Sequence, residues 1–358
     1  MIELSEECRT KLNYDIDIAV KMICEKMDKP PDAILLCGGY GRDEGGWLRI
    51  EGKIRPYNDY DFAIITDSPL SREKTNNLRT SIAEKVGIKW IDIDYYSLKS
   101  LRKLKPTIHN YDLVFGSKVV FGDTNIVKKC KTILPQSITK KDIMVLYKTR
   151  IWTFLGSWDG RFCDLNACDG CFFRNQMAKA ILAACDMTLV KQKKYTVSYR
   201  KRSEICKSIF NGDQKIISLI NFAIKEKLHP SFMPIKNDEM ETLFFSVKDF
   251  FVQCFEKSYG LFSKFYINPT KTIIAEKYSF KNALRCLKHF FLKDVSVALK
   301  SIDVFLAQNY VFNAIGSLND NIFIREANKL MIKWGYLEEE ENDVFVLKGI
   351  VAKARNDF

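Results

Sequence analysis

The chain has 358 residues, of which 47% are hydrophobic and 28% are charged, and its formal net charge is +12 with a sequence pI of about 9.0. These values are typical of globular proteins and exclude a chain that depends on disulfides for its core, and the length predicts two or three domains. The basic balance favours anionic partners, such as nucleotides, nucleic acid, or an anionic lipid or glycan.

The N-terminal segment and the cysteines indicate the compartment. Residues 1–15 are acidic and polar, and they lack the basic and apolar regions of a signal peptide. No apolar run is long enough to span a bilayer. The 11 cysteines are scattered and odd in number, which is typical of reduced thiols. We therefore expect a cytoplasmic protein without a membrane span.

The first third of the chain alternates between helix and strand patterns. The spacing of apolar residues and the positions of glycine and proline predict helices over 2–27 and 71–86, strands over 33–37, 60–66 and 89–96, and a short strand with a turn over 112–121.

After Pro135 the pattern becomes helical throughout. Helices are predicted over 137–158, 172–192, 201–227, 239–262 and 279–308. Phenylalanines recur on their apolar faces, as in the core of a helix bundle. The fold class is therefore α+β, with an N-terminal domain at 1–135 and an all-helical region at 136–358.

A glycine-rich segment, Leu35 to Trp47 (LLCGGYGRDEGGW), follows the first predicted strand. Its five glycines fall within nine positions, and glycine serves where the backbone bends sharply or approaches a ligand closely, which suggests a phosphate site. The segment lacks the Gly-Lys-Ser/Thr ending of a P-loop. A Rossmann unit is also excluded, because the glycines and the proline between residues 45 and 56 interrupt the helix that it requires.

Two predicted strands carry aspartates two residues apart. Asp59 and Asp61 begin one strand, and Asp92 and Asp94 lie in the next. Side chains at i and i+2 of a strand point to the same face. Carboxylate oxygens are the ligands that Mg²⁺ prefers, and two ions held by shared aspartates can clamp both oxygens of an in-line phosphoryl displacement.

These residues resemble the polymerase-β-like nucleotidyltransferase superfamily. The matching elements are the hydrophobic-Gly-Gly sequence that ends at Gly39, the Asp-hydrophobic-Asp sequence at Asp59-Tyr60-Asp61, and a third aspartate on a later strand. The string GGYGRDEGG with NDYDF is also similar to a bacterial subgroup with a GGYGRGEG-type loop. The interval before Asp59 is longer than in most members, and residues 45–54 look like an inserted hairpin or excursion.

The resemblance covers about the first 135 residues. It implies a nucleotidyltransferase-type mixed sheet flanked by helices in a catalytic domain at 1–135. It also implies that the helical domain at 136–358 closes over the nucleotide and binds the acceptor.

The resemblance also implies a role for each matched residue. The backbone N–H groups of Gly38 and Gly39 would approach the nucleotide phosphates. Asp59 and Asp61 would bind two Mg²⁺ ions, with Mn²⁺ as an alternative. Asp94 would hold the metal that activates the acceptor oxygen; Asp92, on the same strand face, is the alternative third carboxylate.

Two cations are candidates for the triphosphate. Arg42 lies in the glycine-rich segment, and an exposed loop arginine is the alternative interpretation. Lys179 lies on a predicted helix of the second region, from which it would contact the triphosphate or the acceptor. A solvated helix lysine is the alternative there.

The implied reaction is Mg²⁺-dependent transfer of an NMP from an NTP to an acceptor hydroxyl or phosphate, with release of pyrophosphate. A small molecule or a sugar is the expected acceptor, because the similarity is greater to stand-alone bacterial members than to polymerases. An RNA end, a protein hydroxyl, and the synthesis of a cyclic oligonucleotide are the enzymatic alternatives. A degenerate nucleotide-binding module that acts as an antitoxin or regulator is the alternative without catalysis, and the intact carboxylates argue against it.

Two further segments are candidates for binding. The basic residues between Tyr195 and Arg202 are suited to an anionic acceptor such as RNA, with Tyr195 and Tyr199 available for stacking. Cys163, Cys168 and Cys171 have the spacing of three iron–sulfur or zinc ligands, with Cys185 or Cys206 as a fourth. The absence of a second CxxC favours reduced thiols in a loop between helices.

Overall fold

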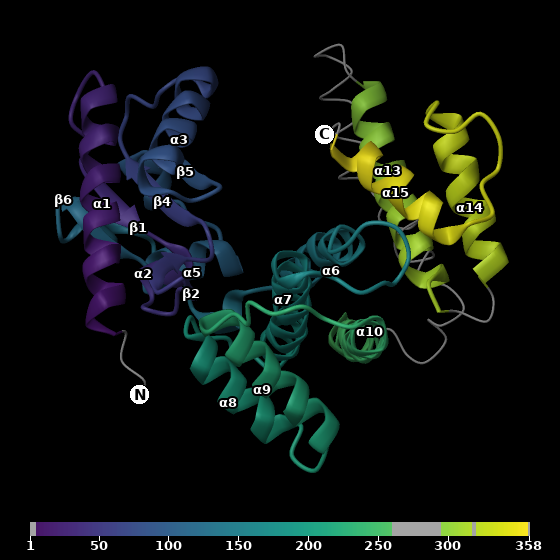
Figure 1. Cartoon of the computed structure of the whole chain (residues 1–358). Coiled ribbons are helices and arrows are strands. Elements are labelled where there is room, and N and C mark those ends of the chain that lie inside the picture. Colours follow the sequence, from purple (N-terminus) through teal and green to yellow (C-terminus); the bar gives the residue numbers. More distant parts are fainter. Residues whose placement is uncertain (1–4, 260–294, 317–319, 357–358) are drawn as a thin grey trace. The chain divides into compact units, whose positions relative to one another are not determined.

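The structure is a computed structural model that describes residues 5–259, 295–316 and 320–356 (Figure 1). It divides into two compact units that do not follow the order of the chain. The first unit is Met1–Asp142 with Cys185–Phe232, and the second is Ile143–Ala184 with Met233–Phe358. The sequence predicts one boundary near residue 135, whereas in the structure a helical segment from the second half of the chain belongs to the same unit as the sheet.

The first unit is built on a four-stranded mixed sheet with the order β5-β4-β1-β6. The strand β1 pairs antiparallel with both β4 and β6, and β4 pairs parallel with β5. The expected α+β class with a small mixed sheet is thereby confirmed. The strands are β1 (Ala33–Leu36), β4 (Tyr60–Ile65), β5 (Ile91–Tyr96) and β6 (Lys118–Gly122).

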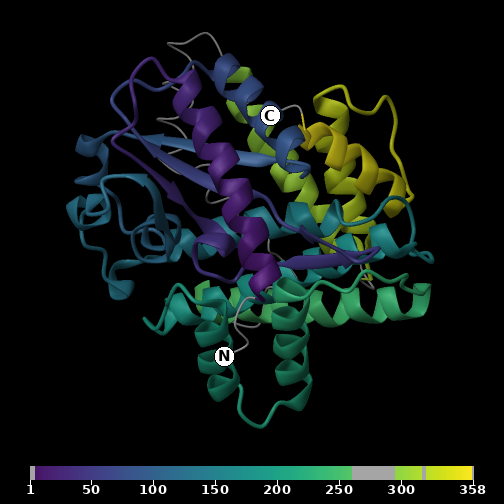
Figure 2. The ribbon, with the colours of Figure 1, turned by 60° about the vertical axis from the view of Figure 1, so that its left-hand side comes forward.

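The two faces of this sheet are covered by different elements. The helices α1 (Glu6–Lys26) and α3 (Arg72–Val86) cover the face that carries Tyr60, Phe62 and Ile64, and Figure 2 shows α1 running across the strands. The other face, with Ala63 and Ile65, packs against shorter elements. These are α4 (Leu98–Leu101), α5 (Ile108–Gly116) and the 3₁₀ turns η1 (Ile126–Lys129) and η2 (Pro135–Ser137).

The glycine-rich segment folds as one helical turn followed by a hairpin. The turn is α2 (Gly38–Gly41), and the hairpin consists of β2 (Trp47–Ile50) and β3 (Lys53–Pro56) in antiparallel register. The two strands are joined by the two residues Glu51-Gly52, which is the length of a tight hairpin turn. The hairpin predicted within the longer interval before Asp59 is therefore confirmed.

Two predicted elements differ from the structure. The predicted strand and turn over 112–121 is the end of α5 followed by β6. The predicted helix over 201–227 is two helices, α8 (Tyr199–Ile209) and α9 (Gln214–Leu228), which lie side by side (Figure 2). The chain breaks between them because Asp213 caps α9 by accepting a hydrogen bond from the Ile216 N–H.

The second unit is helical in its described residues. It contains most of α6 (Lys140–Leu155), the first part of α7 (Ala167–Lys191), α10 (Asn237–Tyr259), α13 (Val295–Ala314), α14 (Asp320–Lys333) and α15 (Val344–Asn356). Its core is aromatic, as predicted. Phe154 contacts Phe244, Phe251 and Phe312 at ring-centroid distances of 5.6, 5.4 and 5.1 Å.

Part of the predicted helix over 279–308 lies outside the described residues, and α13 covers its end. Among the helices described, none combines the length and the apolar character that a bilayer crossing needs.

Candidate functional site

The four predicted aspartates lie on one face of the sheet, at the end where β1 stops. The register pairs Asp61 with Asp92 and Ala63 with Asp94, so both β5 carboxylates share the face of Asp61. Asp59 precedes Asp61 by two residues. Asp59 and Asp94 are exposed, whereas Asp61 and Asp92 are half-buried. We call these four residues the acidic cluster.

The glycine turn is packed directly against this cluster. The Cys37 N–H donates to the backbone carbonyl of Asp61 at 2.7 Å. Gly38 has a φ of +63°, and a Cβ at this position would lie 2.0 Å from Oδ2 of Asp61. Only glycine satisfies both conditions, so the first glycine of the motif is required by the approach of the Asp61 carboxylate.

The acidic cluster is electrostatically unbalanced. Burial, together with the charges of Asp92 and Asp59, raises the pKa of Asp61 to about 6, against the opposing fields of Lys227 and Arg42. Carboxylates held this close favour either a proton or a bound cation. Burial, with the charge of Asp61 next, also raises the pKa of Cys37 to about 12, so this thiol is not a nucleophile near neutral pH.

The carboxylates suit a hard cation in their chemistry, and the structure limits how they would bind it. Within the described residues, no group of three or more His, Cys, Asp or Glu side chains is arranged to hold a metal ion. Mg²⁺ is usually bound through one or two carboxylates together with substrate phosphates. The described carboxylates therefore offer a cation at most two ligands together, and the binding of Mg²⁺ stays a prediction.

The structure distinguishes the two candidates for the third carboxylate by their surroundings. Asp92 stands opposite Asp61, and its Oδ1 accepts a hydrogen bond from Trp90 Nε1 at 2.7 Å. Asp94 stands opposite Ala63 and is more exposed. Asp92 thus has the closer electrostatic coupling to Asp61, and Asp94 has the more accessible carboxylate.

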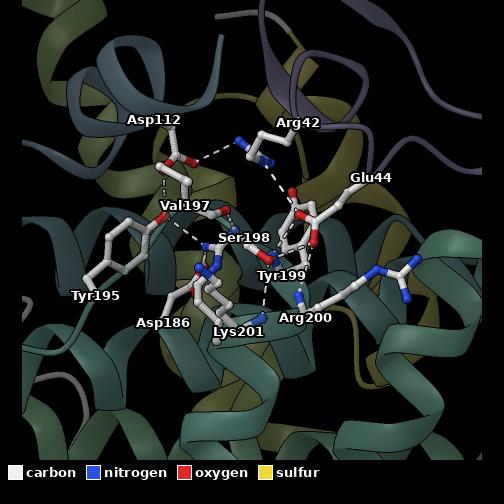
Figure 3. A network of polar contacts seen from close by, with 11 residues as sticks. Arg42, Glu44, Asp112, Asp186, Tyr195, Val197, Ser198, Tyr199, Arg200 and Lys201 are labelled. Carbon is white, nitrogen blue, oxygen red and sulfur yellow. Dashed lines mark hydrogen bonds and ion pairs between the residues drawn. The ribbon is translucent and has the colours of Figure 1, made fainter. Parts of the chain in front are cut away.

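The side chain of Arg42 is only 5% exposed, so Arg42 is not an exposed loop arginine. Its Nη1 lies 3.3 Å from Oδ2 of Asp112, and its Nε lies 3.8 Å from Oε2 of Glu44 (Figure 3). Its guanidinium lies 4.7 Å from the ring centroid of Tyr199. These contacts already engage its charge, and contact with a triphosphate stays a prediction.

Glu44 joins the glycine-rich segment to α8, a role that the sequence did not reveal. Its Oε1 accepts from Ser198 Oγ at 2.8 Å and from the Arg200 N–H at 3.1 Å, and its Oε2 accepts from the Tyr199 N–H at 2.8 Å (Figure 3). Ser198 is the N-cap of α8. The buried carboxylate therefore satisfies the free N–H groups at this helix terminus.

The last two glycines of the segment allow close packing. A Cβ on Gly45 would lie 2.1 Å from Cδ1 of Tyr40, and a Cβ on Gly46 would lie 2.8 Å from the carbonyl oxygen of Lys227 on α9. The Tyr40 hydroxyl donates to the Gly46 carbonyl at 2.7 Å. The segment thus follows the surface of α9 closely, which explains glycines that a phosphate turn alone does not need.

The basic segment between Tyr195 and Arg202 is largely structural. Arg202 donates to both carboxylate oxygens of Asp186 and to the Tyr195 hydroxyl, each at 2.8 Å, and Tyr195 donates to Asp112 at 3.1 Å (Figure 3). Arg202 and Tyr195 are each only 2% exposed. They are therefore unavailable for stacking on RNA or pairing with it, and the predicted RNA-binding role of this segment does not apply to these two residues.

Lys227 is the cation that the sequence analysis missed. It lies in the last turn of α9 and is buried, and its Nζ lies 5.4 Å from the ring centroid of Tyr199. It opposes the rise in the pKa of Asp61 more strongly than Arg42 does. No carboxylate in the described part of the chain lies within ion-pair distance of its Nζ. Lys227 follows the buried Ala223 by four residues, and a lysine on the apolar stripe of a helix is a signal that the sequence did contain.

A second donor lies beside Lys227. The Nδ2 atom of Asn58 is buried and has no hydrogen-bond partner in the described residues. A Cβ on Gly46 would lie 3.0 Å from this Nδ2 atom and 2.8 Å from the backbone carbonyl oxygen of Lys227. Asn58 also directly precedes Asp59. The unsatisfied Asn58 amide therefore lies close to the backbone of Lys227, and a buried N–H without an acceptor is suited to an anionic ligand.

The remaining predicted residues lie in the second unit. Lys179 is half-buried on the part of α7 that belongs to that unit, and its contact with a triphosphate stays a prediction. Cys163 and Cys168 are exposed and Cys171 is buried. Cys185 and Cys206 are buried in the first unit, where the Cys206 thiol donates to the Cys185 carbonyl at 3.7 Å.

Comparison with known proteins gives no match: no family model, no curated protein and no solved structure is significantly similar to this chain.

Removing the Glu44 carboxylate tests its role at α8. We expect Glu44→Ala to destabilise the start of α8 by about 2–3 kcal/mol, because three N–H and O–H donors and the Arg42 cation lose a charged acceptor. Hydrogen exchange at the amides of Tyr199 and Arg200 measures this effect directly.

The matched control is the neighbouring substitution Asp43→Asn. Asp43 is exposed and pairs with Lys118 at the surface, so its loss is expected to change exchange at α8 very little. Equal exchange in both variants would contradict the proposed capping role of Glu44.

Neutralising Asp61 is expected to stabilise the first unit in Mg²⁺-free buffer at pH 7.5. The folded state raises the pKa of Asp61 from 3.8 to about 6, so ionisation opposes folding, by up to about 3 kcal/mol. The folded state binds the proton more tightly than the unfolded chain, so wild type gains stability as the pH falls from 7 to 4. The advantage of Asp61→Asn is therefore largest above pH 6 and disappears near pH 4.

Hydrogen exchange of the β4 and β5 amides, followed across this pH range, measures the effect. Asp94→Asn is the control, because Asp94 lies on the same face and is exposed. A pH-independent difference between wild type and Asp61→Asn would show that the charge of Asp61 does not oppose folding.

Proposed function

We propose that this chain is a Mg²⁺-dependent nucleotidyltransferase that moves an NMP from an NTP to an acceptor hydroxyl or phosphate and releases pyrophosphate. The observation that carries the proposal is the packing of Asp61 against Gly38, with the other three aspartates on the same sheet face. The glycine turn, which would bind the phosphates, and the carboxylate cluster, which would bind the cation, are thereby adjacent. Nucleotidyl transfer assisted by a metal ion requires this arrangement.

Lys227 and Asn58 are the proposed phosphate donors of the first unit. Lys227 supplies a positive charge whose field reaches Asp61, and Asn58 supplies a buried N–H that has no other partner in the described residues. The backbone of Gly38 and Gly39 would complete this side of the site. Donors that are already in place lose little conformational freedom when they bind the phosphates of the NTP.

The carboxylates would have two roles. Asp59 and Asp61 would hold Mg²⁺, which when bound neutralises the phosphate oxygens and polarises the phosphorus they surround. Asp94, with its exposed carboxylate, would orient the acceptor hydroxyl and accept its proton. Asp92 would contribute its negative charge next to Asp61, or replace Asp94 as the third carboxylate.

Pyrophosphate release tests the proposal. The protein is incubated with each labelled NTP, Mg²⁺ or Mn²⁺, and a cell extract as the source of acceptors, and label transfer is followed together with pyrophosphate. We expect the double substitution Asp59→Asn/Asp61→Asn to reduce the rate at least about 1,000-fold, since both proposed cation ligands are lost.

Asp67→Asn is the matched control. Asp67 is exposed and follows the opposite end of β4. Equal rates for the control and the double variant would contradict the site assignment. Tight nucleotide binding without pyrophosphate from any NTP would instead support the non-catalytic regulatory module.

Lys227→Met is expected to raise KM for the NTP about 10–100-fold with a smaller change in kcat. A cation that binds the phosphates equally in the ground state and the transition state affects mainly KM. Steady-state kinetics of pyrophosphate release measures both constants.

Lys225→Met is the control on the same helix, because Lys225 is exposed. If both lysine variants have the same KM as wild type, Lys227 does not contact the nucleotide.

A further inference from the structure

Half of the net charge of the chain is concentrated in a short stretch of the first unit. Residues 97–132 contain eight Lys and Arg residues and only two acidic residues, Asp112 and Asp123, a formal charge of +6 out of the total of +12. Asp112 pairs with Arg42, and Asp123 pairs with Lys129 at 2.7 Å. The surrounding acidic residues therefore leave most of these cations unneutralised.

The fold joins two basic runs of this stretch into one surface. The Lys131 N–H donates to the Leu101 carbonyl at 3.0 Å, and Leu101 and Leu104 share a hydrophobic cluster with Ile126 and Ile133. Of the eight cations in this stretch, Lys118 pairs with Asp43 and Lys129 with Asp123, and the other six form no ion pair within the described residues. The basic surface consists of seven exposed side chains: Lys99, Arg102, Lys103, Lys105, Lys128, Lys129 and Lys131.

A chain of contacts connects this surface to the acidic cluster. Tyr96 follows Asp94 by two residues on β5 and therefore lies on the same face. Its hydroxyl lies 2.9 Å from Nε2 of the exposed His109. The side chain of the next residue, Asn110, donates to the Lys105 carbonyl at 2.9 Å. The rings of Tyr96 and His109 thus connect Asp94 to the basic surface.

We propose that the acceptor of this enzyme is the end of a single-stranded nucleic acid that lies along the basic surface. Its phosphates would contact the seven cations, and a base near its end would stack on Tyr96 and His109. Its terminal hydroxyl would reach Asp94. This inference rests on the proposed nucleotidyl transfer, and it replaces the small molecule or sugar expected from the sequence.

The transfer step balances with the NTP as the only co-reactant. The terminal hydroxyl oxygen forms a bond to the α-phosphorus, and the bond from that phosphorus to the bridging oxygen of the β-phosphate breaks. Pyrophosphate leaves with the bonding electrons, and the hydroxyl proton passes to a carboxylate of the acidic cluster. The strand is extended by one nucleotide.

The aromatic link favours a nucleic acid over a membrane as the anionic partner. A bilayer surface would satisfy the cations, but it offers no ring to stack on Tyr96 and no hydroxyl at the end of a chain to reach Asp94. A single strand has both, together with regularly spaced phosphates.

Binding of a fluorescent oligouridylate to the full chain, measured by anisotropy without NTP or Mg²⁺ at several salt concentrations, tests the surface. The triple substitution Lys103→Gln/Lys128→Gln/Lys131→Gln is expected to weaken binding about 100-fold at 0.1 M salt. It should also reduce the slope of log K against log salt by about 2, because each phosphate contact on a single strand contributes about 0.7.

The control is Lys26→Gln/Lys29→Gln/Lys85→Gln, which removes three exposed lysines of the first unit that lie outside the basic surface. Equal weakening by both triple variants would overturn the proposal, because the binding would then reflect net charge. Stronger binding to vesicles of anionic phospholipid than to the oligonucleotide would also overturn it. An oligodeoxyuridylate in parallel shows whether RNA or DNA is the strand.

Extension of the same oligonucleotide by labelled NTP and Mg²⁺ separates this inference from the proposed function. Extension that falls about 100-fold in the basic-surface variant supports the inference. Pyrophosphate release with another acceptor, and no binding of the oligonucleotide, would overturn the inference and leave the proposed function standing. Oligonucleotide binding without pyrophosphate from any NTP would overturn the proposed function and the acceptor role together.

Discussion

The capping of α8 by Glu44 is the interaction on which the arrangement of the candidate site depends. One end of the segment that carries Glu44 is fixed at Gly38 by the approach of Asp61, and Glu44 fixes the other end to the N-terminus of α8. Because α9 follows α8 directly and carries Lys227, this single carboxylate links the proposed phosphate-binding lysine to the carboxylates on β4. The link runs through a helix terminus, where the free N–H groups would otherwise need water or another acceptor.

The buried carboxylates of the first unit have two different electrostatic environments. Burial raises the pKa values of Asp112 and Asp186, but Arg202 opposes this in both residues through direct or nearby charge, so the network around Tyr195 is balanced from within. In the acidic cluster, the fields of Lys227 and Arg42 oppose the rise in the pKa of Asp61, but the pKa of this carboxyl is still raised to about 6. Buried ion networks of the first kind position groups more than they stabilise the fold. An imbalance of the second kind is typical of sites that acquire a charge on binding.

Local patterns in the sequence predicted most of the helices and strands. Which of them pack into the same unit depends on long-range contacts that the sequence did not show. Strict alternation predicted the strand at 89–96, and the interval before Asp59, longer than in most members of the superfamily that the chain resembles, indicated the hairpin. The same periodicity could not show that residues 185–232 belong to the unit of the sheet, because that depends on contacts more than 100 residues apart, such as those of Glu44 with α8. The four aspartates were visible as pairs. The burial of the Arg42 side chain and the position of Lys227 depend on the same distant contacts. Because the sequence did not show which helices join the unit of the sheet, it led to Lys179, which lies in the other unit.

The glycine-rich segment also determines how rigid the site is before a ligand binds. Gly38 is opposed by a carboxylate, Gly45 by the ring of Tyr40, and Gly46 by a backbone carbonyl of α9, so none of these three positions has room for a side chain. The hydroxyl of Tyr40 also contacts the backbone on both sides of the inserted hairpin, at Gly46 and Asn58. A phosphate-binding segment that is ordered in advance loses little conformational entropy when it binds. Its glycines therefore serve close packing, and the resulting rigidity places Asn58, Asp59 and Asp61 at fixed positions for the chemistry that the acidic cluster would perform.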